Sequence, residues 1–117
     1  MKAVIKSFGC PDAEDLETWR PESNRFAIPI ELLIGPDDGI GEESFDVVVC
    51  SAAWLADEAR NCGIVDGRHI YIVDHWDWPG IRAYFETCVS SLPSGTWHEV
   101  ATLLARMGHW EFEDYQE

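Results

Sequence analysis

Two neighbouring stretches of the chain alternate apolar and polar positions with a period of two. The first covers residues 26–34 and the second residues 44–50, and each places its apolar side chains on one face of a strand: Phe26, Ile28, Ile30, Leu32 and Ile34, then Phe45, Val47 and Val49. Residues 35–41 between them contain Pro36 and the pair Asp38-Gly39, which are typical of a turn. The pattern predicts a β-hairpin.

Pro29 interrupts the first of these strands. Proline has no N–H to donate to a ladder, so we expect this strand to lie at an edge of the sheet or to be bulged there. Three further stretches also have strand character. They are residues 2–8, residues 69–73, and residues 109–115, in which Trp110 and Phe112 alternate with Glu111, Glu113 and Tyr115.

Three helices are predicted from their start signals and apolar spacing. Ser51 is a suitable N-cap for a helix through Cys62, and its stripe would be Leu55, Ala59 and Cys62. Asp77 caps a second helix, over residues 77–92, with Pro79 in its first turn. Residues 96–99 read Thr-Trp-His-Glu, a capping box that begins a third helix extending to about Met107.

The order of these elements predicts an α+β fold, because strands and helices are interleaved without a strict βαβ rhythm. We expect a single domain over residues 1–117, with a mainly antiparallel sheet of about four to five strands packed by about three helices. Six Trp and five Phe exclude a disordered acidic tail. The four cysteines form no CxxC pair, which favours reduced thiols. The polar start and the lack of a long apolar run favour a cytoplasmic protein.

Negative charge is concentrated in two places. The chain carries 22 acidic and 8 basic residues, for a net charge of −14. Residues 26–59 hold eight of the acids and residues 107–117 hold four more, and neither stretch contains Lys or Arg. Such a field favours a basic partner and disfavours nucleic acid and anionic membranes, although solubility alone would also account for it.

No catalytic motif stands out. The chain lacks HExxH, GxSxG and a phosphate loop. The best cluster is His69, Asp74 and His75, which leaves a small metal-dependent hydrolase as one alternative function. Trp76 and Trp78 flank Asp77 and are candidate interface anchors, which leaves a homo-oligomeric structural module as another. Trp97 and Trp110 fall in regular apolar stripes and are expected in the core.

Four ordered blocks carry a family resemblance. They are IGPDDGIGEESFDVVVCSAAWL, GRHIYIVDHWDW, WHEVATLL and the closing GHWEFEDY. Together they resemble the immunity protein 8 family of bacterial polymorphic toxin systems, nearly end to end. The resemblance implies a small α+β protein that binds a cognate secreted or contact-delivered toxin in the producer's cytoplasm and blocks it. It implies no catalytic residue, metal or cofactor.

We therefore expect the partner to be a toxin domain with a basic surface. A nuclease is one target class, because nuclease clefts must hold phosphates. The candidate partner-binding residues lie in the hairpin, at the paired tryptophans and in the last strand: Asp37, Asp38, Glu42, Glu43, Asp46, Trp76, Trp78, Glu111, Glu113, Asp114 and Tyr115. The sequence leaves open whether the two acidic stretches form one surface.

Overall fold

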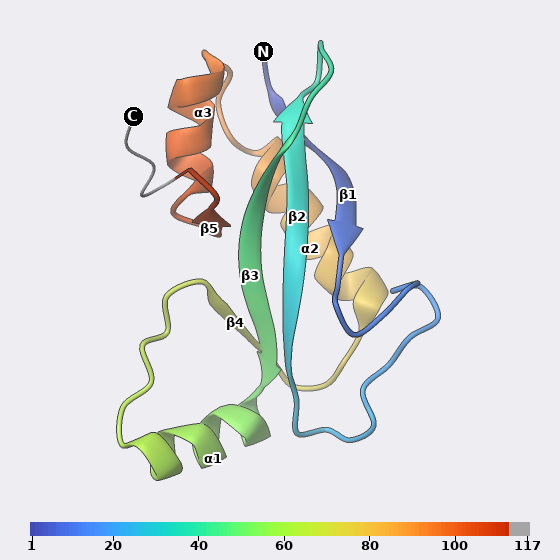
Figure 1. Ribbon diagram of the computed structural model, residues 1–117, viewed down its shortest axis with the longest axis vertical. Helices are drawn as coiled ribbons and strands as arrows, with labels where there is room; N and C mark the ends of the chain where they lie inside the picture. The colour runs from blue at the N-terminus through green and yellow to red at the C-terminus, as the bar shows by residue number, and fades with distance from the viewer. Residues whose placement is uncertain (113–117) are drawn as a thin grey trace.

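A computed structural model describes residues 1–112 of the chain (Figure 1). Five strands and three helices follow in the order β1 (Ala3–Gly9), β2 (Ala27–Pro36), β3 (Glu43–Ser51), α1 (Ala52–Cys62), β4 (Ile70–Val73), α2 (Trp78–Ser90), α3 (Trp97–Leu104) and β5 (His109–Trp110). Among the described residues, no helix has the length and apolar composition needed to cross a membrane.

One mixed sheet contains all five strands. Its main order is β1-β2-β3-β4, and β5 pairs with β3 beside β4. Among the described strands, the β3–β4 pair alone is parallel and the other pairs are antiparallel. The side of β3 that faces away from β2 therefore pairs with two strands. β5 lies opposite Phe45 and Asp46, and β4 lies opposite residues 48–51. The predicted α+β class and mainly antiparallel sheet are confirmed.

Pro29 was predicted to lie on an edge strand or at a bulge. β2 as a whole is an inner strand, but at Pro29 one of its sides is open. β2 lies between β1 and β3, but β1 ends at Gly9, opposite Glu31, so Pro29 lies beyond the end of its neighbour. At Pro29 the β1 side of the strand is unpaired, which is where a residue without N–H can be accommodated. The bulge is in β1 instead, between Ile5 and Ser7.

The core lies between the sheet and helices α2 and α3. Helix α2 passes behind the sheet in Figure 1, and the packed cluster contains residues from both layers: Leu32, Phe45, Val47, Phe85, Val89, Val100 and Leu104. The alternation in residues 26–34 and 44–50 is thus confirmed as one buried face. On the opposite face Pro29, Glu31 and Asp46 are exposed.

Three local predictions need correction. Helix α1 contains no buried residue, and Cys62, expected at an apolar position, is exposed because α1 extends from the end of β3 away from the main core (Figure 1). Helix α3 ends at Leu104, and residues 105–107 form turns before Gly108. Strand β5 covers only His109 and Trp110, since Glu111 and Phe112 already turn.

Candidate functional site

The two acidic stretches meet where β3 begins and β5 ends. Phe45 pairs with Trp110 and Asp46 with His109. The contact continues past the strand, because the Glu111 N–H donates to the Ser44 carbonyl at 3.2 Å and the Ser44 N–H donates to Glu111 Oε1 at 2.8 Å. This places Glu43 close enough to Glu111 for the two charges to repel each other. The sequence left open whether the two stretches meet, and the structure brings Glu111 of the second stretch against the start of β3; Glu113, Asp114 and Glu117 lie outside the described residues.

Glu43 is the most constrained carboxylate of this surface. Its side chain is half-buried and accepts a hydrogen bond from the indole N–H of Trp97, the first residue of α3. Burial raises the pKa of Glu43, and the negative charge of Glu111 raises it further. The Trp97 hydrogen bond acts in the opposite direction. Two repelling carboxylates are thus held together beside an aromatic wall.

Trp110 forms that wall with Trp97. Its ring stacks on Phe45 with centroids 6.1 Å apart and meets Phe112 edge-on at 6.2 Å. Its indole nitrogen is buried and has no hydrogen-bond partner among the described residues. We name Glu42, Glu43, Glu111, Trp97 and Trp110 the acidic corner.

The expectation that Trp97 and Trp110 belong to the core is only half correct. Both are half-buried and pack against the core, yet they also form the walls around Glu43. Sequence periodicity identified their apolar face but missed this second role, and it did not single out Phe112, whose side chain is 41% exposed. The period-two pattern of the last segment already placed Trp110 and Phe112 on one side, but such a pattern does not indicate how exposed that side is.

The tip of the β2–β3 hairpin contributes further acids. Asp37 accepts a hydrogen bond from the backbone N–H of Lys2 at 3.0 Å, so part of its role is to anchor the start of β1. Asp38 and Glu42 are exposed, and Ile40 between them is 97% exposed. Gly35 allows the tip to close, because a Cβ there would lie 2.1 Å from the carbonyl oxygen of Gly41.

The two paired tryptophans differ in how much surface they offer a partner. Trp78 is only 4% exposed and meets Phe8 edge-on at 5.1 Å, so it has no surface to offer a partner. Trp76 is half-buried and packs against Trp19, Phe26 and Trp78. The backbone turns into α2 between the two tryptophans, and their rings connect the loop before β2 to that helix.

The metal-site alternative fails on geometry. His69 precedes β4, whereas Asp74 and His75 follow it, and an extended strand of this length separates its ends by more than about 10 Å. The His69 ring also contacts the carbonyl of Ala105 at 3.0 Å. Within residues 1–112, no three His, Cys, Asp or Glu side chains are grouped as metal ligands.

Of the remaining candidates, Asp46 lies on the uncovered face of the sheet, between Glu31 and His109 in the strand register. Glu113, Asp114 and Tyr115 lie outside the described residues.

Comparison with known proteins identifies a family. A family model described as Immunity protein 8 matches residues 3–115. Comparisons with curated proteins and with solved structures give no match.

Proposed function

This chain belongs to the immunity protein 8 family and is therefore an immunity protein of a toxin system, and we propose that it neutralises its cognate toxin by binding it at the acidic corner. The observation that carries the proposal is the paired contact between Ser44 and Glu111, which brings Glu111 beside the acid-rich start of β3. Inhibition would need only binding, inside the producing cell, without catalysis.

The charge of the corner supports a basic partner. Opposite fields steer two proteins together, and steered association approaches about 10⁸–10⁹ M⁻¹s⁻¹ at low salt. Rapid capture suits an inhibitor whose target harms the cell that makes it. A toxin that attacks nucleic acid must carry a cationic cleft for phosphates, so a nuclease is the target class that this field fits best.

The aromatic side chains beside the acids would add short-range binding energy to the long-range attraction of the charges. Trp97, Trp110 and Phe112 are aromatic side chains at the surface, and Trp is enriched among residues that dominate binding energy. Burial raises the pKa of Glu43, which marks a site where water is already partly excluded. A Lys or Arg entering beside Glu43 would therefore meet a carboxylate that lacks full hydration and gains from a new partner.

Co-expression with the toxin encoded beside the gene for this chain tests the proposal. We expect the wild-type protein to restore growth and to form a stable complex. The double variant D38K/E42K changes two exposed acids that make no hydrogen bond or ion pair among the described residues, so it should fold normally but bind more weakly. The matched control D12K/E22K makes the same charge change in the loop before β2.

The comparison of the two double variants is decisive. Equal loss in both would mean that net charge alone matters, and full protection by D38K/E42K would contradict binding at this end of the hairpin. Failure of the wild-type protein to bind the toxin would overturn the proposed function itself.

A further inference from the structure

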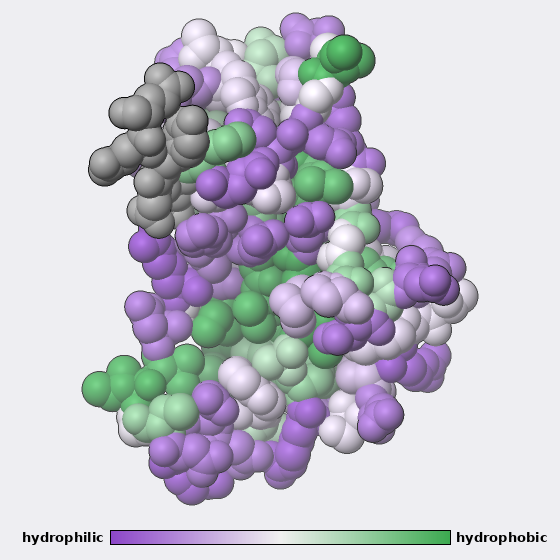
Figure 2. All heavy atoms as spheres, in the orientation of Figure 1, coloured by the Kyte–Doolittle hydropathy of each residue, from purple (hydrophilic) through white to green (hydrophobic). Residues whose placement is uncertain are grey.

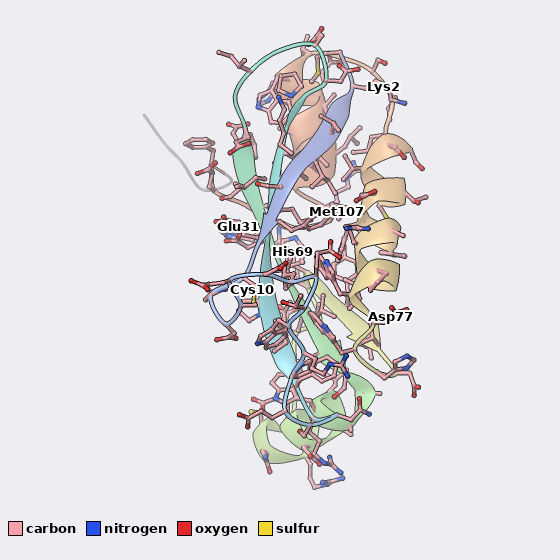
Figure 3. All side chains as sticks on the ribbon, turned by 90° about the vertical axis from the view of Figure 1, so that its right-hand side faces the viewer. Lys2, Cys10, Glu31, His69, Asp77 and Met107 are labelled. Atoms are coloured by element: carbon pink, nitrogen blue, oxygen red, sulfur yellow. The ribbon has the colours of Figure 1, made fainter. Side chains whose placement is uncertain are left out.

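The uncovered face of the sheet is a second feature that faces solvent. Helices α2 and α3 pack on one side, and the opposite side carries Pro29, Glu31 and Asp46 exposed, with Val48 half-buried. Figure 2 views this side directly and shows apolar atoms over the middle of the sheet between polar ones. Figure 3 shows Glu31 on the side of the sheet away from α2.

This face is hollowed rather than flat. A depression of about 570 Å³ has Pro29, Glu31, Asp46 and Val48 in its floor. Cys10 and Pro11 line one side, and the other side is lined by Arg68, His69 and His109. The depression thus crosses the sheet from the end of β1 to β5, next to the acidic corner.

Two like-charged residues occupy directly paired positions in the floor of the depression. Glu31 of β2 and Asp46 of β3 are direct cross-strand partners, and both side chains are exposed. Like charges in this arrangement destabilise a sheet. Within residues 1–112, neither carboxylate has an ion pair or a hydrogen bond that would offset the repulsion. Their neighbours in the same row are Gly9 and His109, and the Glu31 carboxylate leans over Gly9, with Oε1 3.5 Å from where a Cβ would stand. Arg68 lines the same depression.

The edge of the sheet beside this floor does not favour addition of a strand. β1 ends opposite Glu31, so residues 27–30 of β2 have no neighbour on that side. Pro29 lies in the middle of this open segment and has no N–H for a ladder, a device that protects edges against strand addition. A partner is therefore directed onto the face of the sheet and not to its edge.

Resting on the proposed function, we propose that this depression receives a basic segment of the cognate toxin, whose Lys or Arg side chain bridges Glu31 and Asp46. The aliphatic part of such a side chain would cover Pro29 and Val48, and its charge would relieve the repulsion between the two carboxylates. The contact would continue from the acidic corner, since Asp46 and Ser44 lie two residues apart on β3. A second copy of this chain fits less well, because it also carries a net charge of −14.

The test uses the near-isosteric double variant E31Q/D46N and the matched control D12N/E22Q. Removal of the opposed charges should raise the melting temperature by roughly 2–4 °C, because the repulsion is lost. The same variant should bind the toxin at least about tenfold more weakly, because a bridged cation loses both charged partners. The control should change neither quantity appreciably.

The opposite signs of the two effects separate this idea from simple unfolding. A variant that melts higher and still binds as tightly as the wild type would overturn the sheet-face contact while leaving the proposed function intact. Sedimentation could instead show that the wild type is a dimer and that the E31Q/D46N substitutions weaken or strengthen that dimer. This result would assign the sheet face to a second copy of the chain and would overturn the proposed contact with the toxin. Absence of any complex with the wild type would instead count against the proposed function.

Discussion

The side chain of Glu111 accepts a hydrogen bond from the backbone N–H of Ser44 at 2.8 Å, across 67 residues of sequence. With the return bond from the Glu111 N–H to the Ser44 carbonyl, it extends the β3–β5 pairing by one position. The same glutamate raises the pKa of Glu43 through its charge. Glu111 thus holds its own segment against the start of β3 and also repels the Glu43 carboxylate there.

Two substitutions at Glu111 should separate these roles. E111A removes the acceptor for the Ser44 N–H and should lower the free energy of unfolding by roughly 0.5–1 kcal/mol, a small effect because water can reach this exposed amide. E111Q keeps an acceptor oxygen and removes the charge, so it should be at least as stable as the wild type. Urea unfolding of both variants checks this, and equal destabilisation by the two would contradict a structural role for the hydrogen bond.

Glu43 should make stability depend on pH. Burial, assisted by the charge of Glu111, raises its pKa in the folded protein above the ordinary value of 4.5. The folded state therefore binds the proton more tightly than the unfolded chain, and the contribution of Glu43 to stability falls as pH rises from about 4.5 through the raised pKa. E43Q stays neutral and retains an acceptor for Trp97.

Melting temperature measured from pH 4 to pH 8 checks this prediction. The difference between E43Q and the wild type should be smallest at the acidic end and should grow in favour of E43Q as pH rises. A constant difference would mean that Glu43 titrates in the folded protein as it does in the unfolded chain. The same series in an E111Q background should show a smaller rise, because one cause of the raised pKa has been removed.

The hairpin tip should depend on Gly35 and not on Gly39. G35A would place a Cβ 2.1 Å from the carbonyl oxygen of Gly41, so the turn must open, at a cost of about 1–3 kcal/mol. G39A makes only an ordinary contact, 3.6 Å from Pro36 Cγ, and should be nearly neutral. Thermal melting of the two alanine variants provides the comparison. Equal tolerance of both would show that the tip is not held closed in solution.

The sequence predicted those parts of the fold that local patterns determine. The period-two run of residues 26–34 became β2, and the capping box at Thr96 begins α3, where its side chain accepts from the Glu99 N–H. Partner choice between strands is not a local property. Nothing in the sequence near β4 requires it to pair parallel with β3, and nothing near β5 requires it to share the same edge.

The same limit applies to the candidate site. The acids were found by composition, but the approach of Glu111 to the start of β3 depends on its contact with Ser44, which only the folded chain creates. Trp78 was expected at the surface because spacing does not reveal the turn that buries its ring against Phe8. Conversely, Trp97 was assigned to the core, since nothing local indicates that its indole N–H reaches Glu43, 54 residues away.

Salt should distinguish an electrostatic interface from an apolar one. The exposed acids Asp38, Glu42 and Asp46 act on a basic toxin at a distance, and screening shortens that reach to about 8 Å at physiological ionic strength. The association rate with the toxin should therefore fall steeply as salt rises, whereas the dissociation rate should change much less, because contacts already formed at Trp97 and Trp110 are short-ranged.

Stopped-flow measurements over a series of salt concentrations give both rates. The association rate of D38K/E42K should depend less on salt concentration than that of the wild type. If the acidic corner faces the toxin during encounter, the control D12K/E22K should reduce this salt dependence by a smaller amount. At high salt the two variants and the wild type should converge in association rate, since the long-range field is then screened in all three. An association rate that does not respond to salt would assign recognition to the aromatic side chains, with the acids serving solubility alone.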